Sequence, residues 1–355
     1  MRSAADANEA ARWADALGVS REAIDLYLAC DVLDLHVDTF IWTRVFGYDL
    51  LRRHGRGLFN ARFYGHADLP RLREAHVAGA IWSITTNPLR RRARRLVVFR
   101  ENLAHLIAHL GRAPSEVAHC RDVAEFRAAR ARGQHAAFIG VQGGNALDAD
   151  PSLESIDARA IVKVTLVHLS TSSLGTTSAP LARRPDAGLT DSGIELVRAL
   201  DRHRVFVDLA HINRRGFFDA VAAHDRSLPL LVSHTGIAGV HLHWRNVDDE
   251  QLRAVADTGG VIGVMYQHSF LGAGGKRAER VVDHLAHIVA TVGEDFAALG
   301  SDWDGAITTP RDMATCLELP RLVQHMLDRG WSAERVRKIL GANFLRALGA
   351  LRPPE

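Results

Sequence analysis

A histidine and an aspartate stand two residues apart at the end of a short apolar segment, in the run Asp34-Leu35-His36-Val37-Asp38. Side chains alternate between faces in an extended segment, so His36 and Asp38 project from the same side of the chain. Imidazole nitrogens and carboxylate oxygens are both common ligands of zinc and similar ions. The pair is therefore a candidate half of a metal site, although a buried histidine beside a carboxylate explains the same pattern.

Further polar side chains come at the ends of other apolar runs. These side chains are Gln142, His168, His211, His234 and Asp302. A single histidine is more often a core or surface residue than a ligand. All seven polar residues would converge on one mouth, however, if their runs were parallel strands of a barrel. The set as a whole therefore favours a metal site.

The apolar runs predict eight strands separated by helices. The strands are expected at 32–38, 80–84, 136–141, 162–168, 205–211, 230–234, 261–266 and 297–302, with amphipathic helices at 99–111, 190–203, 247–258 and 277–292. Alternating strands and helices predict a parallel sheet, and eight repeats predict a (β/α)8 TIM barrel. A doubly wound sheet is the alternative, but no Gly-x-Gly-x-x-Gly turn follows any of the runs.

The 355 residues show no linker or low-complexity tract, so we expect a single domain over 1–355. A short helical extension of about 30 residues should precede the barrel, and helices from Leu317 onward should follow it. Thr190 is a candidate N-cap for the helix at 190–203, with Asp191 in its first turn.

Composition narrows the classes of partner. The chain is 47% hydrophobic and 24% charged with a net charge of +3, as in ordinary globular proteins. The densest basic run, at 90–95, lacks interleaved aromatic residues, so a solvated helix face explains it better than nucleic-acid binding. Three widely spaced cysteines predict neither a disulfide framework nor a CxxC site. We see neither a signal peptide nor a membrane-spanning run and therefore expect a cytoplasmic protein without a membrane partner.

Ordered stretches along nearly the whole chain resemble the membrane dipeptidase (renal dipeptidase) family of zinc-dependent metallohydrolases. They are Asp34-Leu35-His36-Val37-Asp38, Gly65-His66-Ala67-Asp68-Leu69-Pro70-Arg71-Leu72-Arg73-Glu74, Gly140-Val141-Gln142-Gly143-Gly144, Val164-Thr165-Leu166-Val167-His168, Val207-Asp208-Leu209-Ala210-His211, Val232-Ser233-His234, Trp244-Arg245-Asn246-Val247, Gly300-Ser301-Asp302-Trp303-Asp304-Gly305 and Gly341-Ala342-Asn343-Phe344-Leu345-Arg346. The resemblance implies a barrel of the metal-dependent hydrolase type that holds two zinc ions and hydrolyses a dipeptide.

The resemblance also implies a ligand set. His36 and Asp38 would bind one ion, His211 and His234 would bind the other, and position 142 would bridge the two. A metal lowers the pKa of bound water toward about 7, which supplies hydroxide at neutral pH.

Three residues would act on the substrate by the same resemblance. His168 would face the tetrahedral intermediate, and Arg245 would bind the terminal carboxylate of the substrate. Asp302 would exchange a proton with the attacking water. These roles suit the residue types, because arginine offers a planar fork to a carboxylate and aspartate can act as a base and then as an acid.

The chain departs from the family at position 142, where the family has a glutamate and this chain has Gln142. A neutral amide oxygen bridges two cations much more weakly than a carboxylate does. Three outcomes stay open: two metals bound with lower affinity, one metal with hydrolysis retained, or an altered or inactive homologue that binds a small metabolite or a partner. Of the two positions, that of His36 and Asp38 is expected to be the weaker or empty one.

The substrate class is less defined than the site. A dipeptide, an N-acyl amino acid or another amide would suit a zinc ion and an arginine, and a hydrolase of lactones or phosphoesters is a further alternative. The segments 167–171 and 176–184 are expected to line or cover the mouth. A homodimer is possible by analogy alone.

Overall fold

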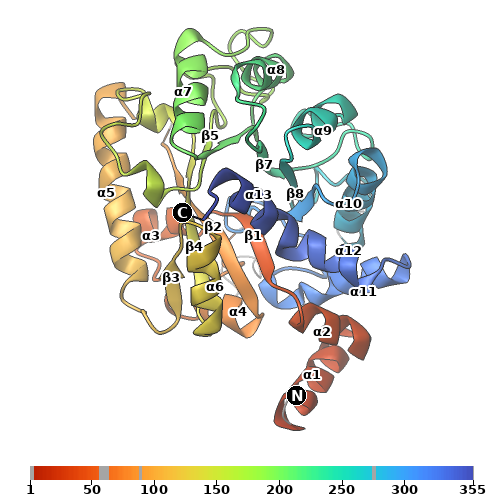
Figure 1. Cartoon of the computed structure of the whole chain (residues 1–355). Coiled ribbons are helices and arrows are strands. Elements are labelled where there is room, and N and C mark those ends of the chain that lie inside the picture. Colours follow the sequence, from red (N-terminus) through yellow and green to blue (C-terminus); the bar gives the residue numbers. More distant parts are fainter. Residues whose placement is uncertain (1–3, 56–63, 88–89, 274–276, 355) are drawn as a thin grey trace.

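A computed structural model describes residues 4–55, 64–87, 90–273 and 277–354 of the chain. The first three residues of the expected N-terminal extension lie outside this part. Within it, eight parallel strands close into a barrel with helices around the outside (Figure 1). The strands follow one another around the barrel in the order β1-β2-β4-β5-β6-β7-β8-β9, and β9 pairs again with β1. The predicted (β/α)8 barrel is therefore confirmed.

Each predicted strand overlaps an observed one. The strands are β1 (Val32–Val37), β2 (Val77–Thr85), β3 (Val117–His119), β4 (His135–Gln142), β5 (Lys163–Thr165), β6 (Phe206–Asp208), β7 (Leu231–Thr235), β8 (Val261–Val264) and β9 (Ala297–Leu299). The sequence did not predict β3, because three residues are too few to show an alternating pattern. This strand pairs with the start of β4 at 135–137, whereas β5 pairs with its end at 140–142.

Several strands are shorter than predicted at the end where the polar residues lie. The expected strands at 162–168, 205–211 and 297–302 stop at Thr165, Asp208 and Leu299. His168, His211 and Asp302 therefore lie in the connections that follow, each three residues beyond the strand. The chain leaves the sheet early because these connections turn sharply, with a positive φ of 68° at His211 and 62° at Asp302.

The helices fill the connections between strands and the two ends of the chain. They are α1 (Ala4–Leu17), α2 (Arg21–Leu28), α3 (Phe40–Phe46), α4 (Leu69–Glu74), α5 (Arg92–Leu110), α6 (Val123–Ala131), α7 (Asp191–Arg202), α8 (Arg214–Ala223), α9 (Asp249–Ala256), α10 (Glu279–Val292), α11 (Pro320–Asp328), α12 (Ala333–Arg337) and α13 (Asn343–Leu351). Thr190 caps α7 as predicted, accepting a hydrogen bond from the Gly193 backbone N–H. Most of the basic run opens α5 on an exposed face.

An aromatic plug closes the amino-terminal end of the barrel. Phe344 of α13 packs against Phe138 of β4 and Phe206 of β6, with ring centroids 5.5 and 6.1 Å apart. These rings belong to a buried apolar cluster that includes the first residues of several strands. The opposite, carboxyl-terminal end is left for polar side chains, as is usual for the functional face of this fold.

The first two helices stand to one side of the barrel, with α1 pointing away from it (Figure 1). Trp13 of α1 donates a hydrogen bond to the Leu317 carbonyl oxygen, at 3.3 Å. Among the residues that the structure describes, no helix combines the length and apolar character needed to cross a lipid bilayer.

Candidate metal centre

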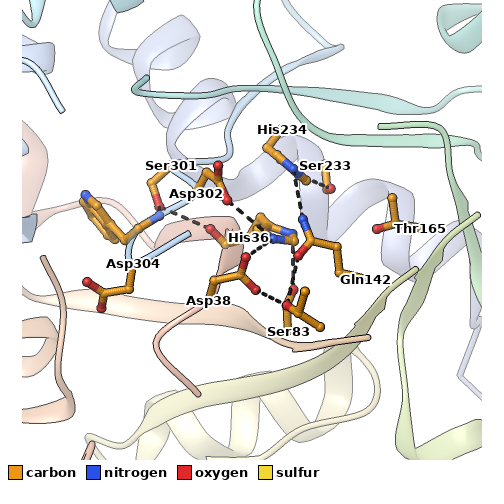
Figure 2. Close-up of polar contacts among 12 residues, drawn as sticks. His36, Asp38, Ser83, Gln142, Thr165, Ser233, His234, Ser301, Asp302 and Asp304 are labelled. Atoms are coloured by element: carbon orange, nitrogen blue, oxygen red, sulfur yellow. Dashed lines mark hydrogen bonds and ion pairs between the residues drawn. The ribbon is translucent and has the colours of Figure 1, made fainter. Parts of the chain in front are cut away.

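The polar residues predicted from strand ends meet at the carboxyl-terminal mouth of the barrel. We divide them into two groups. The histidine half comprises Gln142 at the end of β4, His234 in β7 and His211 after β6. The carboxylate half comprises His36 in β1, Asp38 just after it and Asp302 after β9. All six side chains are buried, and Figure 2 shows how five of them lie toward one another.

The side chains of the histidine half lie within chelating distance of each other. The Nε2 atoms of His211 and His234 are 2.9 Å apart, and the amide nitrogen of Gln142 lies 3.3 and 3.5 Å from them. The partly exposed His168 ring lies edge-on to that of His211, with centroids 4.7 Å apart. Two imidazole nitrogens and an amide group thus border one small buried volume, and imidazole nitrogens suit a transition metal.

The carboxylate half is more open. His36 Nε2 lies 3.5 Å from Asp38 Oδ2 and 3.7 Å from Asp302 Oδ1, beyond hydrogen-bonding distance of both. Among the described residues, His36 Nε2 has no hydrogen-bond partner. Ligand atoms of His36, His234 and Asp302 all lie within 4.8 Å of one another. The described part of the chain therefore contains a candidate metal site where the two halves meet.

Thr85, at the end of β2, connects the halves and bears on how Gln142 is oriented. Its hydroxyl oxygen lies 2.6 Å from Asp38 Oδ1 and 2.9 Å from Gln142 Oε1. One hydroxyl proton cannot serve both oxygens, and the carboxylate is the stronger acceptor. A half-turn of the Gln142 amide would let Thr85 accept from its NH2 group and would direct the carbonyl oxygen toward the two histidines.

Burial sets the charge of the mouth. It lowers the pKa of both His211 and His234 well below the usual value, and lowers that of His168 to about 4. These imidazoles are therefore neutral at neutral pH, the form that binds a metal. Burial and the charge of Asp38 together raise the pKa of Asp302 well above its usual value, so this carboxyl group holds its proton readily.

A polar layer lies beneath the mouth, inside the barrel. Lys163 forms an ion pair with Asp208, with Nζ and Oδ2 2.7 Å apart and both side chains fully buried. Thr165 and Ser233 each donate a hydroxyl hydrogen bond to the same Asp208 oxygen, at 2.5 and 2.6 Å. Our sequence analysis assigned no role to these four residues. A signal was present, because a lysine within the apolar run at 162–167 is rare unless it has a buried partner.

This layer prepares His234 to bind a metal. Since Ser233 gives its proton to Asp208, its oxygen accepts a hydrogen bond from His234 Nδ1, 2.8 Å away. The proton of His234 is then on Nδ1, and the lone pair of Nε2 points toward His211 and Gln142. A metal-bound histidine usually donates its second N–H to such a partner. His234 is therefore oriented to bind a metal ion, whereas the Nδ1 atom of His211 has no hydrogen-bond partner among the described residues.

Two polar residues within the stretches that resemble the family, Asp34 and His66, have positions that support the backbone. Asp34 accepts hydrogen bonds from the backbone N–H groups of His36 and Ser301, each at 3.0 Å, which ties β1 to the loop after β9. Burial raises the pKa of Asp34 to about 7. His66 accepts at Nδ1 from the Asp304 backbone N–H, at 2.9 Å, and so holds the neighbouring turn.

Arg245 lies in the loop between β7 and α9, close to the histidine half. Its Nη2 donates to the His234 carbonyl oxygen at 2.8 Å, while its Nε has no hydrogen-bond partner among the described residues. Burial lowers the pKa of this guanidinium to about 10, so it stays charged at neutral pH. A buried cation with an unused donor is suited to an anionic group of a ligand.

Comparisons with known proteins agree with this geometry. A family model described as membrane dipeptidase (peptidase family M19) matches residues 20–352. Dipeptidase tcpJ of Claviceps purpurea (strain 20.1) is 30% identical over 303 residues, which is 80% of this chain and 69% of that protein. An uncharacterized protein in the pqqA 5′ region of Klebsiella pneumoniae is 36% identical over 171 residues. That match covers 46% of this chain and 62% of the Klebsiella protein, less than two thirds of its length.

Solved structures with the same fold include two metallopeptidases. One, from Rhodobacter sphaeroides, holds a phosphinate mimic of the dipeptide L-Ala-D-Ala and matches with a TM-score of 0.79 at 26% identity, over 91% of this chain and 99% of that one. Dipeptidase AC, a metallopeptidase of family M19, matches with a TM-score of 0.78 at 27% identity, over 90% and 98%. The probable dipeptidase PvdM of Pseudomonas aeruginosa has a TM-score of 0.82 at 17% identity, over 94% and 98%, and supports the fold alone.

The family match covers nearly all of the barrel and includes every residue of the two halves. The barrel, the strand-end histidines and carboxylates, and the matched structures all lead to the same assignment. This chain belongs to the membrane dipeptidase family, peptidase family M19.

Proposed function

We propose that this chain is a metal-dependent hydrolase that cleaves a dipeptide or a related amide. The observation that carries the proposal is the histidine half, where two neutral imidazoles face each other at 2.9 Å beside the Gln142 amide. With the Gln142 amide turned so that its oxygen faces the imidazoles, these three side chains would offer a cation three buried donor atoms. The Rhodobacter relative, which holds a dipeptide mimic, supports the substrate class.

Zinc is the metal that the donor set suits best. Imidazole nitrogens are borderline ligands that bind zinc in many hydrolases. His211, His234 and the carbonyl oxygen of Gln142 would hold the ion. When bound, zinc lowers the pKa of its water toward about 7 and so supplies a nucleophile at neutral pH.

The remaining roles fall to side chains of this chain. The charged Arg245, with its unused Nε–H, binds the carboxylate of the substrate and so places the scissile amide at the mouth. Asp302, whose raised pKa makes its carboxylate a stronger base, takes a proton during attack and returns it to the departing amine. His168 is neutral at the rim of the site, where it can donate a hydrogen bond to an oxygen that gains negative charge.

Gln142 supports a second candidate function. Because the resemblance places a glutamate at this position, the chain has one negative charge fewer between the two halves. A weakened metal site could leave a barrel that binds a dipeptide-like metabolite through Arg245 without cleaving it. The hydrolase is favoured, because Asp302 and both histidines of the histidine half are retained.

Metal analysis paired with a dipeptide panel separates the two functions. The protein is purified without added zinc, its metal content is measured by mass spectrometry, and turnover is followed before and after zinc is supplied. The hydrolase predicts bound metal and turnover that a chelator abolishes. Less than about half an equivalent of metal, with no turnover after zinc addition, would instead favour the binding protein.

A further inference from the structure

Lys163 is a buried cation directly beneath the mouth, and its position bears on His36. The side chain has 0% exposure, and its Nζ lies 2.7 Å from Asp208 Oδ2, 3.0 Å from Thr165 Oγ1 and 3.0 Å from His36 Nδ1. An ammonium group has three protons to donate and no lone pair with which to accept. The three short contacts therefore match its three protons.

The two hydroxyl groups of this layer help to show which atom accepts the third proton of Lys163. Thr165 and Ser233 both direct their protons to Asp208, so the oxygen of each is available only as an acceptor. Ser233 already accepts from His234 Nδ1 at 2.8 Å and lies farther from Lys163, at 3.2 Å. The third proton of Lys163 is therefore directed to His36.

We propose that Lys163, ion-paired with Asp208, donates to His36 Nδ1 and holds the proton of His36 on Nε2, so that His36 presents an N–H to the carboxylates of Asp38 and Asp302 rather than a lone pair to a metal. The metal centre of this chain is then a single ion bound by the histidine half. The carboxylate half then holds no ion, and the His36 Nε2–H attracts the Asp302 carboxyl group, which makes His36 a positioning residue.

Three observations agree with this assignment. The Nε2 atom of His36 faces two carboxylates, at 3.5 and 3.7 Å, which attract an N–H. Gln142 supplies no negative charge for a second cation. In addition, the second partner of His36 is a cation, whereas a metal-bound histidine needs an acceptor there. The sole competing partner described at Nδ1 is the hydroxyl of Ser83, at 3.2 Å, which could accept from an Nδ1–H.

The tautomer can be measured directly on the metal-free protein. Two-bond proton–nitrogen NMR correlations of protein labelled with ¹⁵N-histidine distinguish the protonated nitrogen of each ring, and the spectrum of His36→Gln identifies the signals of His36. We expect His36 to be protonated on Nε2 and His234 on Nδ1. A signal showing His36 protonated on Nδ1 would overturn the proposal. This measurement requires neither bound metal nor turnover.

Matched variants test whether Lys163 sets the tautomer of His36. Lys163→Met combined with Asp208→Asn removes the cation without leaving a buried unpaired carboxylate, and we expect His36 to move its proton to Nδ1, toward Ser83. Ser83→Ala is the control, since it removes the competing neighbour and should leave the Nε2 proton in place. A change of tautomer in Ser83→Ala, or none in the double variant, would contradict the role of Lys163. If the double variant fails to fold, the wild-type spectrum still decides the tautomer.

The metal count rests on the proposed function and is tested separately. Equilibrium dialysis against zinc should give one equivalent for the wild type, unchanged in His36→Gln and lost in His234→Ala. The Lys163→Met/Asp208→Asn variant should bind a second equivalent about tenfold or more tightly than the wild type does. Two equivalents in the wild type, one of them lost in His36→Gln, would overturn the single-ion centre. Failure of the proposed function would appear differently, as zinc binding without hydrolysis or as no zinc binding.

Discussion

Each half of the barrel mouth contains a buried histidine whose Nδ1 atom contacts the polar layer formed around Lys163 and Asp208. The two histidines differ in which group of that layer they contact. His234 donates to Ser233, which passes its proton to Asp208, so Nε2 keeps its lone pair. His36 instead accepts from Lys163. Both residues are histidines, but the group at Nδ1 is a hydroxyl acceptor for His234 and an ammonium donor for His36. For these two histidines, the group behind the ring therefore decides whether Nε2 offers a lone pair or an N–H.

Asp302→Asn should have the largest effect and tests the proton-transfer role of the carboxylate half. The amide keeps the shape of the side chain but cannot take a proton, so dipeptide turnover should fall about 10²- to 10⁴-fold. The zinc content should not change, since the histidine half is intact. Turnover is followed in a discontinuous assay, and metal content is measured by mass spectrometry. Retained turnover would remove Asp302 from the mechanism.

Arg245→Met tests whether the loop beside the histidine half positions the substrate. Loss of a charged hydrogen-bond donor should raise KM for a dipeptide about 10- to 100-fold. A dipeptide with an amidated carboxyl terminus serves as the control, because it offers no carboxylate for Arg245 and its hydrolysis should change little. Equal losses for both substrates would show that Arg245 acts through the protein rather than on the carboxylate.

Ser233 and Ser83 each lie within hydrogen-bonding distance of the Nδ1 atom of one histidine, so their alanine variants form a matched pair. Ser233→Ala removes the acceptor of the His234 Nδ1–H and should lower zinc affinity about 10- to 100-fold. Ser83→Ala alters the surroundings of His36 and should leave zinc affinity close to that of the wild type. Affinity is measured by competition with a chromogenic chelator. Equal effects of the two substitutions would mean that the halves contribute equally to the metal.

Gln142→Glu tests the charge between the halves. A carboxylate oxygen beside His211 and His234 should increase zinc affinity by about tenfold or more, because it adds a negative charge next to the ion. The number of ions should stay at one per chain while Lys163 still holds His36. The same chelator competition, with a stoichiometric titration, measures both quantities. An unchanged affinity would mean that position 142 does not contact the metal.

The halves should also differ in how pH affects the stability of the metal-free protein, and this is the smallest effect. His234 has a lowered pKa, so the unfolded state binds more protons below about pH 6.5 and stability falls as the pH drops. Asp34, beneath the carboxylate half, has a pKa raised from 3.8 to about 7, so its contribution is lost as the pH rises between these values. Each group changes the slope by at most about 1.4 kcal/mol per pH unit.

The comparison needs two variants and one method. Denaturant unfolding of Asp34→Asn should show a smaller loss of stability between pH 4 and 7 than the wild type shows. His234→Asn should show a smaller loss as the pH falls below about 6.5. Slopes that match the wild type in both variants would mean that other groups control the pH dependence.

Much of the fold and the site could be predicted from the sequence. Runs of apolar residues with helical segments between them indicated the barrel, because each strand is buried on both faces and reads as continuously apolar. The seven polar residues at the ends of these runs do meet at the mouth. The strand β3 was missed because it is short and pairs beside the barrel rather than within it. The ends of three strands were placed too late, because backbone turns at His211 and Asp302 leave little trace in hydrophobic pattern.

The sequence by itself determined which residue types reach the mouth, since strand order and the alternation of side chains fix that much. Its resemblance to the family also implied that Gln142 stands where a bridging glutamate is expected. Only the tertiary structure decided which hydrogen bonds stand behind each histidine. Lys163, Asp208 and Ser233 come from β5, β6 and β7, and they meet His36 of β1 because the barrel closes. Contacts across a closed barrel depend on side-chain reach and on the direction of each proton, which no local pattern in the sequence records.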